Sequence, residues 1–281
     1  MRDEQDSTFW SRLALEAELR AGVTGGQLEL HFQPVVTLTT GRIVGFEALV
    51  RWRHPTRGLV APADFIPLTE EIGLIVPLGA WVVEEACRVA SGWPVGQDGT
   101  PLSIAVNASA RELGVPGYAR RVQRAMEAAG LAPGQLVLEV TETALVEDPQ
   151  GVATCLHELR GLGTRIAIDD FGTGYSSLAY LQQFPIDILK IDRAFIDGVR
   201  GVDEGMPRIV RGLFELGRAL GLELLAEGIE QDEQIEQLVR AGCDLGQGFV
   251  FAEPVDEQRA MRLAEDATSV WWVGAGRRGA A

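Results

Sequence analysis

The chain has 281 residues, and its 40 Asp and Glu against 25 Lys and Arg give a formal net charge of −15. This balance argues against avid, sequence-independent binding to long nucleic acid, which depends on neutralising phosphates with Lys and Arg. Three scattered cysteines and three scattered histidines indicate neither a disulfide framework nor a zinc site. The length suffices for one large core, so we expect one domain with short extensions.

Residues 1–26 are predicted to form a helical segment that leads to the turn at Gly25 and Gly26 and packs on the domain that follows. The first residues are charged and lack an apolar core, so no signal peptide is expected. The most apolar stretch, 72–83, is interrupted by Pro77 and is too short to span a bilayer. We therefore expect no membrane segment in this chain and a cytoplasmic location.

The first two predicted strands, 27–36 and 42–52, are joined by only the five residues 37–41. So short a connection does not allow a parallel crossover, and the two strands are expected to pair antiparallel. The second strand carries Glu47 inside an apolar run, where an unpaired carboxylate is expensive to bury.

Short apolar runs alternate with helical segments through the rest of the chain. The runs are 102–106, 136–138, 164–168, 187–189, 222–225 and 244–246. Helical spacing of apolar residues covers 77–92, 148–161, 207–220 and 232–240. About eight strands in this α/β alternation predict a TIM-like (β/α)8 barrel with the first strand reversed. We assign 27–265 to the barrel and 266–281, which includes Trp271 and Trp272, to a largely disordered tail.

A polar residue lies at the end of most of these runs, and another interrupts the second strand. Active sites of such barrels gather at the carboxyl ends of the strands, so these side chains are expected to converge on one mouth. They are Glu47, Asn107, Glu139, Asp169, Asp170, Lys190, Glu227 and Gln247. Adjacent carboxylates such as Asp169 and Asp170 repel each other, and a nearby cation would offset that repulsion. Taken alone, that pair also fits a solvated strand end or an N-cap, and Lys190 alone fits a lysine reaching solvent.

The expected donors are carboxylate and amide oxygens, which suit Mg²⁺ or Mn²⁺ better than Zn²⁺. Two such ions about 3.5–4 Å apart would activate water and hold a phosphodiester for in-line displacement. A metal site is therefore the first hypothesis for this mouth.

The motifs and their order resemble the EAL domain, the cyclic-di-GMP phosphodiesterase module of bacteria. The tripeptide that names the family stands here as Glu47-Ala48-Leu49, and the resemblance covers about 28–254. Further matching motifs are FQP at 32–34, RWRHP at 51–55, FIPL at 65–68, VN at 106–107, LEVTE at 138–142, DDFGTGYSS at 169–177, LKID at 189–192, AEG at 226–228, GCD at 242–244 and QG at 247–248.

The resemblance implies hydrolysis of cyclic-di-GMP to linear pGpG with two Mg²⁺ or Mn²⁺ ions, and inhibition by Ca²⁺. It implies that one ion is held by Glu47, Asn107, Glu139 and Asp169, and the other by Asp169 and Asp170, with Glu227 reaching it directly or through water. It implies that Lys190 orients the attacking water and that Gln247 stands near the same water. The implied contacts of the dinucleotide are Gln33, Leu49, Arg51 and Asn107. Glu142 would anchor the loop 171–177, and a homodimer is expected because the family often dimerises.

A different function stays open: a receptor that binds cyclic-di-GMP, or a partner protein, on the same barrel without turnover. Degenerate members of the family typically lose metal ligands, the lysine or the loop sequence, and this chain keeps all of them, which favours the enzyme. The chain departs from the commonest family pattern at Ala108, Glu112, Ala194 and Gln231. None of these is an expected metal ligand, and at Glu112 a glutamine is frequent.

Overall fold

A computed structural model of the protein describes residues 15–96, 99–172, 183–199 and 206–266. The strands are β1 (Leu28–Thr37), β2 (Arg42–His54), β3 (Gly58–Val60), β4 (Ser103–Asn107), β5 (Leu136–Thr141), β6 (Arg165–Phe171), β7 (Ile188–Ile191), β8 (Glu223–Ala226) and β9 (Leu245–Gly246). The helices are α2 (Pro62–Glu71), α3 (Ile75–Ala90), α4 (Ala110–Leu113), α5 (Tyr118–Ala129), α6 (Glu142–Glu147), α7 (Pro149–Gly161), α9 (Arg193–Ile196), α10 (Arg208–Ala219), α11 (Asp232–Arg240) and α12 (Glu257–Glu265).

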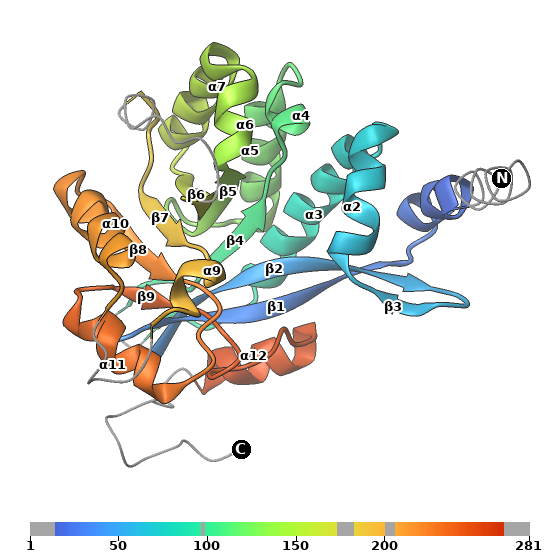
Figure 1. The fold of residues 1–281 in the computed structure, drawn as a ribbon. Coiled ribbons are helices and arrows are strands. Elements are labelled where there is room, and N and C mark those ends of the chain that lie inside the picture. The colour runs from blue at the N-terminus through green and yellow to red at the C-terminus, as the bar shows by residue number, and fades with distance from the viewer. Residues whose placement is uncertain (1–14, 97–98, 173–182, 200–205, 267–281) are drawn as a thin grey trace, which may run out of the picture.

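The strands form one sheet in the order β1-β9-β8-β7-β6-β5-β4-β2-β3, and an additional β1–β2 pairing closes eight of them into a barrel. The extra strand, β3, lies on the outer edge of β2. Helices cover the outside of the barrel (Figure 1). The predicted TIM-like barrel is confirmed.

The first strand is reversed, as predicted: β1 pairs antiparallel with both β2 and β9, whereas β2 pairs parallel with β4. The connection is a tight turn in which the Gly41 amide donates to the Thr37 carbonyl at 2.7 Å. Gly41 has φ of 68°, a left-handed value that glycine adopts without strain.

The predicted helices are present as α3, α7, α10 and α11, with ends shifted by a few residues. The expected break at Pro77 is wrong, because Pro77 is the third residue of α3. Amides of the first helical turn have no intrahelical acceptor, so proline is tolerated there. No described helix combines the length and the apolar composition that crossing a membrane requires.

The barrel strands bury one apolar layer inside the barrel and another under the helices, because successive residues of a strand face opposite sides. The inner apolar layer consists of Val35, Ala105, Val137, Ala167, Ile188, Leu225 and Leu245. The alternate residues, such as Leu136 and Leu138 of β5, face outward and are fully buried under the helices. Residues two positions further along these strands face the same interior and lie at the mouth of the barrel.

Residues 15–24 form a helix beside the β2–β3 hairpin, at the end of the molecule that projects from the barrel (Figure 1). Leu19 is fully buried, and Glu18 Oε2 lies 3.2 Å from His54 Nε2 of β2. These contacts support the proposed packing of the amino-terminal segment. Residues 1–14 and the tail 267–281 with Trp271 and Trp272 lie outside the described residues, so the domain limits 1–26, 27–265 and 266–281 stay predictions.

Two glycines of α10 are expected to respond to alanine in opposite ways. A Cβ at Gly217 would overlap Leu224 Cδ2 and lie 3.3 Å from Leu189 Cδ2, whereas a Cβ at Gly212 meets nothing within 4 Å. We predict that Gly217→Ala lowers the free energy of unfolding by about 1–3 kcal/mol through overpacking. Gly212→Ala should raise it by about 1 kcal/mol through helix propensity. Urea unfolding measures both, and equal effects would contradict the packing of α10 on the barrel.

Candidate active site

The predicted polar residues stand on the interior face of the strands, two residues from the apolar layer. Asn107 follows Ala105, Glu139 follows Val137, Asp169 follows Ala167, Lys190 follows Ile188, Glu227 follows Leu225, and Gln247 follows Leu245. On the reversed strand β1 the step runs the other way, from Val35 back to Gln33, which pairs with Glu47 of β2. The fold therefore brings the predicted residues together at one end of the barrel.

Lys190 lies at the centre of this group and is only 1% exposed. Its Nζ lies 2.7 Å from Glu139 Oε2, 2.7 Å from Glu227 Oε1, 3.1 Å from Asp169 Oδ1 and 3.9 Å from Glu47 Oε2. Burial alone would lower the pKa of Lys190, but these four carboxylates raise it well above its ordinary value. Lys190 is therefore a charged ammonium that holds the acids together, and it does not reach solvent.

Glu47 is fixed by two amides. Asn107 Nδ2 donates to Glu47 Oε1 at 2.9 Å, and Gln247 Nε2 donates both to Glu47 Oε2 and to Gln33 Oε1. Gln247 Oε1 is buried and has no hydrogen-bond partner among the described residues. Burial would raise the pKa of Glu47, but Lys190 and these amide donors lower it below its ordinary value. Glu47 is therefore held as an anion in a fixed orientation.

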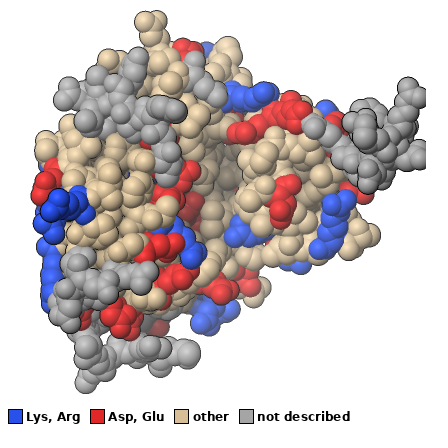
Figure 2. All heavy atoms as spheres, viewed as in Figure 1, with Lys and Arg blue, Asp and Glu red and all other residues tan. Residues whose placement is uncertain are grey.

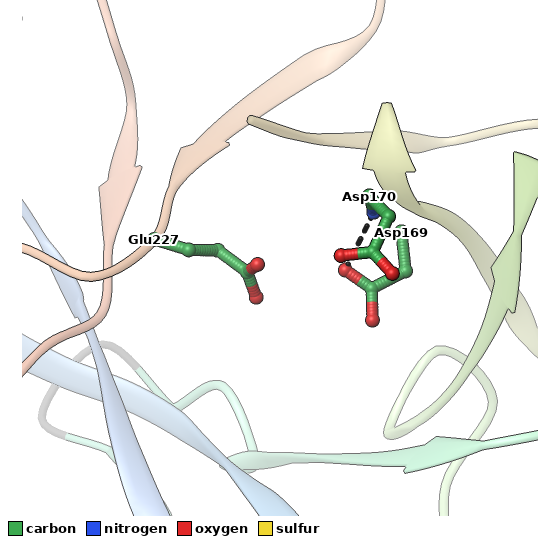
Figure 3. Close-up of side chains that lie close together, drawn as sticks. All are labelled: Asp169, Asp170 and Glu227. Atoms are coloured by element: carbon green, nitrogen blue, oxygen red, sulfur yellow. Dashed lines mark hydrogen bonds between the residues drawn. The ribbon is translucent and has the colours of Figure 1, made fainter. Parts of the chain in front are cut away.

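Asp169, Asp170 and Glu227 form a cluster whose ligand oxygens lie within 4.8 Å of one another, the one such group of His, Cys, Asp and Glu in the described residues. Figure 3 shows Glu227 pointing across the mouth toward the two aspartates. Asp170 has φ of 55°, the only left-handed value at a described non-glycine residue, and its amide donates to Asp169 Oδ1 at 3.0 Å. This turn directs two consecutive carboxylates to one place.

The raised pKa values of Asp170 and Glu227 also indicate that a cation would stabilise the carboxylates of the cluster. Burial raises the pKa of Glu227 to about 8, and burial together with the charge of Asp169 raises the pKa of Asp170. A divalent cation competes with these protons for the carboxylates, so its affinity is expected to rise with pH. The all-oxygen donor set fits a hard ion, and Asp169, Asp170 and Glu227 are able to hold one.

The second expected ligand set, Glu47, Asn107, Glu139 and Asp169, is arranged differently. These residues surround the same centre, but the ammonium of Lys190 lies among their carboxylates. Acidic side chains gather near the middle of the face in Figure 2, where the surface is hollowed between the main body and the lobe on the right.

Glu142 follows β5 directly as the first residue of α6 and is 7% exposed. Its Oε2 accepts from the Gly172 amide at 3.3 Å, and its Oε1 has no partner among the described residues. Gly172 has φ of 96° and lies just after Asp170 and Phe171. Glu142 therefore reaches the loop 171–177 where it leaves β6, and residues 173–177 lie outside the described part of the chain.

Two of the expected substrate contacts, Leu49 and Arg51, lie on β2 beside the polar group. Arg51 is half-buried, its Nη1 donates to the Val50 carbonyl at 3.0 Å, and Leu49 lines a cavity of about 610 Å³ together with Asn107. The same cavity extends between α2, α3, α4 and α6 to Gly79 and Glu112. Sequence reasoning found the strand residues of this region but not the helical wall of the cavity, because apolar helix residues carry no chemical motif.

The comparisons with known proteins agree with this geometry. The model of the family described as "EAL domain" matches residues 16–254, and the chain belongs to that family.

Two of its relatives come from Pseudomonas aeruginosa. The bifunctional diguanylate cyclase/cyclic di-GMP phosphodiesterase MucR is 42% identical over 250 residues, covering 89% of this chain and 36% of MucR. The cyclic di-GMP phosphodiesterase NbdA is 43% identical over 244 residues, covering 86% of this chain and 31% of NbdA. The chain thus spans about a third of the length of the curated relatives it matches.

Solved structures show the same fold. The MucR phosphodiesterase in complex with c-di-GMP superposes with a TM-score of 0.81 at 42% identity, covering 88% of this chain and 99% of that one. The EAL domain of Mycobacterium smegmatis DcpA superposes with a TM-score of 0.72 at 35% identity, covering 85% of this chain and 98% of that one.

We predict that Lys190→Met destabilises the metal-free protein by about 3 kcal/mol or more, because it leaves buried carboxylates without their cation. Divalent cations should then raise the melting temperature of the variant by more than they raise that of the wild type. The control is Arg165→Met, since Arg165 pairs with Glu223 at partly exposed positions two residues before Ala167 and Leu225, at the opposite end of the barrel from the mouth. That pair is expected to contribute at most about 1 kcal/mol. Similar losses in the two variants, measured with a chelator present, would contradict the role of Lys190.

Proposed function

We propose that this chain is a metal-dependent phosphodiesterase that hydrolyses cyclic-di-GMP to linear pGpG. The observation that carries the proposal is the complete polar group at the mouth of an EAL-family barrel. Lys190 touches four carboxylates there, and three carboxylates beside it converge on one point. The named relatives MucR and NbdA, which are called cyclic di-GMP phosphodiesterases, support the choice of substrate.

The donor set supports two divalent cations, and we propose Mg²⁺ or Mn²⁺. One would be held by Glu47, Asn107, Glu139 and Asp169, and the other by Asp169, Asp170 and Glu227. When bound, such ions supply Lewis acidity toward the phosphate and lower the pKa of a coordinated water.

The side chains of this protein orient the reactants. Lys190 is proposed to position the attacking water, since its ammonium lies at the centre of the carboxylates that would hold the ions. Gln247 keeps Glu47 in place through its amide nitrogen, and its unpartnered oxygen offers an acceptor for a proton of the same water. Attack of the water on phosphorus forms one P–O bond and breaks the bond between phosphorus and the ribose 3′ oxygen. That oxygen takes up one proton of the water and becomes a hydroxyl, and the cyclic dinucleotide opens to linear pGpG.

The dinucleotide is proposed to contact Gln33, Leu49, Arg51 and Asn107. Arg51 is suited to a phosphate because its planar guanidinium donates two parallel hydrogen bonds. Binding without turnover is the alternative function, and no feature of the described residues favours it. A homodimer, a cytoplasmic location and the identity of the metal stay predictions from the sequence.

The decisive experiment incubates the purified chain with cyclic-di-GMP after chelation and re-addition of one metal, followed by separation of the products. We expect pGpG with Mg²⁺ or Mn²⁺. With Ca²⁺ we expect binding without turnover, because Ca²⁺ takes more ligands at longer distances and distorts an in-line geometry.

Glu47→Ala should lose turnover by about a thousandfold or more while keeping its fold, since the interaction removed is polar. Turnover that survives chelation, or near-normal rates in Glu47→Ala, would overturn the proposal.

Glu142→Ala is predicted to lower kcat by about a hundredfold, because small misplacements of reacting groups have effects of that size. Loss of the bond to the Gly172 amide leaves the end of β6, with Asp169 and Asp170, less firmly placed. Affinity for cyclic-di-GMP, measured in Ca²⁺, should change little. Glu142→Gln keeps an acceptor for the Gly172 amide and serves as the matched control with a smaller loss. A lower melting temperature with unchanged kcat would mean that Glu142 only stabilises α6.

A further inference from the structure

Glu112 is a buried carboxyl that the proposed mechanism does not use. It lies in α4 and is 2% exposed. Its Oε2 accepts from the Ser109 amide at 3.0 Å and from Ser109 Oγ at 2.7 Å. Its Oε1 is buried without a partner among the described residues and faces Gly79 of α3, where a Cβ would overlap it. One carboxylate oxygen is thus used twice and the other is left unsatisfied.

The same chain contains a neutral counterpart of this arrangement. Gln234 of α11 is also buried, and its Oε1 accepts from the amides of Glu230 and Gln231 at 2.9 and 3.0 Å. Its Nε2 donates to the Ile196 carbonyl at 3.0 Å, so both ends of the amide are satisfied. A glutamine therefore performs this capping role without an unpaired atom, and Glu112 departs from that solution.

The turn that Glu112 holds begins at Ser109, two residues after Asn107, which is the last residue of β4. The last hydrogen bond between β4 and β5 is the one that the Ala108 amide donates to the Glu139 carbonyl at 2.8 Å. From Ser109 onward the turn is fixed by the bonds with Glu112. Asn107 and Glu112 also line the same cavity. A change at Glu112 is thus transmitted over a few residues to the amide that contacts Glu47.

The surroundings of Glu112 determine when it ionises. Burial is the main cause that raises its pKa to about 7, and Glu70 of α2 raises it further. The Ser109 donors and Arg121 of α5 act in the opposite direction, and Tyr118 of α5 is a further titratable neighbour, whose pKa is raised by burial and by Glu112. A raised pKa of the folded state means that the contribution of this group to stability is present at low pH and is lost as the pH rises through about 7.

We propose that Glu112 is a positioning residue for Asn107: its buried carboxyl fixes the Ser109 turn when protonated, and ionisation loosens that turn. An ionised carboxylate with an unsatisfied oxygen is drawn toward water, and the adjoining cavity gives it a path. The consequence for cyclic-di-GMP rests on the proposed function, whereas the consequence for the turn rests on the geometry alone.

The test compares the wild type with Glu112→Gln at pH 6 and pH 8. Amide hydrogen exchange of residues 107–113 should be equal in the two proteins at pH 6 and about threefold faster in the wild type at pH 8. The ratio of their dissociation constants for cyclic-di-GMP in Ca²⁺ should change in parallel. Glu112→Gln should also melt about 3–5 °C higher at pH 8. A second variant, Ser109→Ala, should show the faster exchange already at pH 6.

The matched control is Gln234→Glu, which places a carboxylate in the equivalent position of α11. It should make the melting temperature pH-dependent without a pH-dependent change in affinity for cyclic-di-GMP relative to the wild type. Exchange or affinity ratios that do not change between pH 6 and pH 8 would overturn the proposal, even if Glu112→Gln is more stable. If the wild type fails to bind cyclic-di-GMP, the proposed function is wrong, and the exchange ratio still decides the role of Glu112.

Discussion

The site depends on the period of two that a strand imposes on its side chains. On the interior face of the barrel, an apolar residue and the polar residue two positions further along the strand form two stacked layers. Val137 with Glu139 and Ile188 with Lys190 are examples. The apolar layer fills the barrel below the mouth, and its packing fixes the position of each polar group along the barrel axis. A shift of one residue in β5, for example, would replace Glu139 by Leu138 or Val140 at the mouth.

Charge balance is the second requirement, because these groups are too buried to rely on water. The ammonium of Lys190 contacts Glu139, Glu227 and Asp169 closely and Glu47 at a longer distance. One cation does not neutralise four carboxylates. Burial, together with the charges of Asp169 and Glu47, raises the pKa of Glu227, and the remaining negative charge makes the mouth attractive to divalent ions.

The sequence predicted the barrel and the convergence of the polar residues because both follow from short-range patterns. The five-residue connection 37–41 required an antiparallel pair, and a polar residue after each apolar run indicated where the mouth lies. The position of Lys190 among its expected ligand partners was not predictable, since it depends on contacts between strands far apart in sequence. Helix α2 carries Pro67 in its interior and showed no clear apolar period, whereas α5 was missed although Tyr118, Val122 and Met126 are buried at helical spacing.

Lys190 is also the only lysine among the 281 residues, and arginine supplies every other basic side chain counted with it. Arginine does not react with acylating reagents that target amines, so this chain offers them one side-chain amine, and that amine is buried in the active site. The speed of its acylation is therefore a measure of how often this amine is both exposed and released from the carboxylates that keep it protonated. A protein with lysines on its surface would hide that event in a background of uninformative labelling.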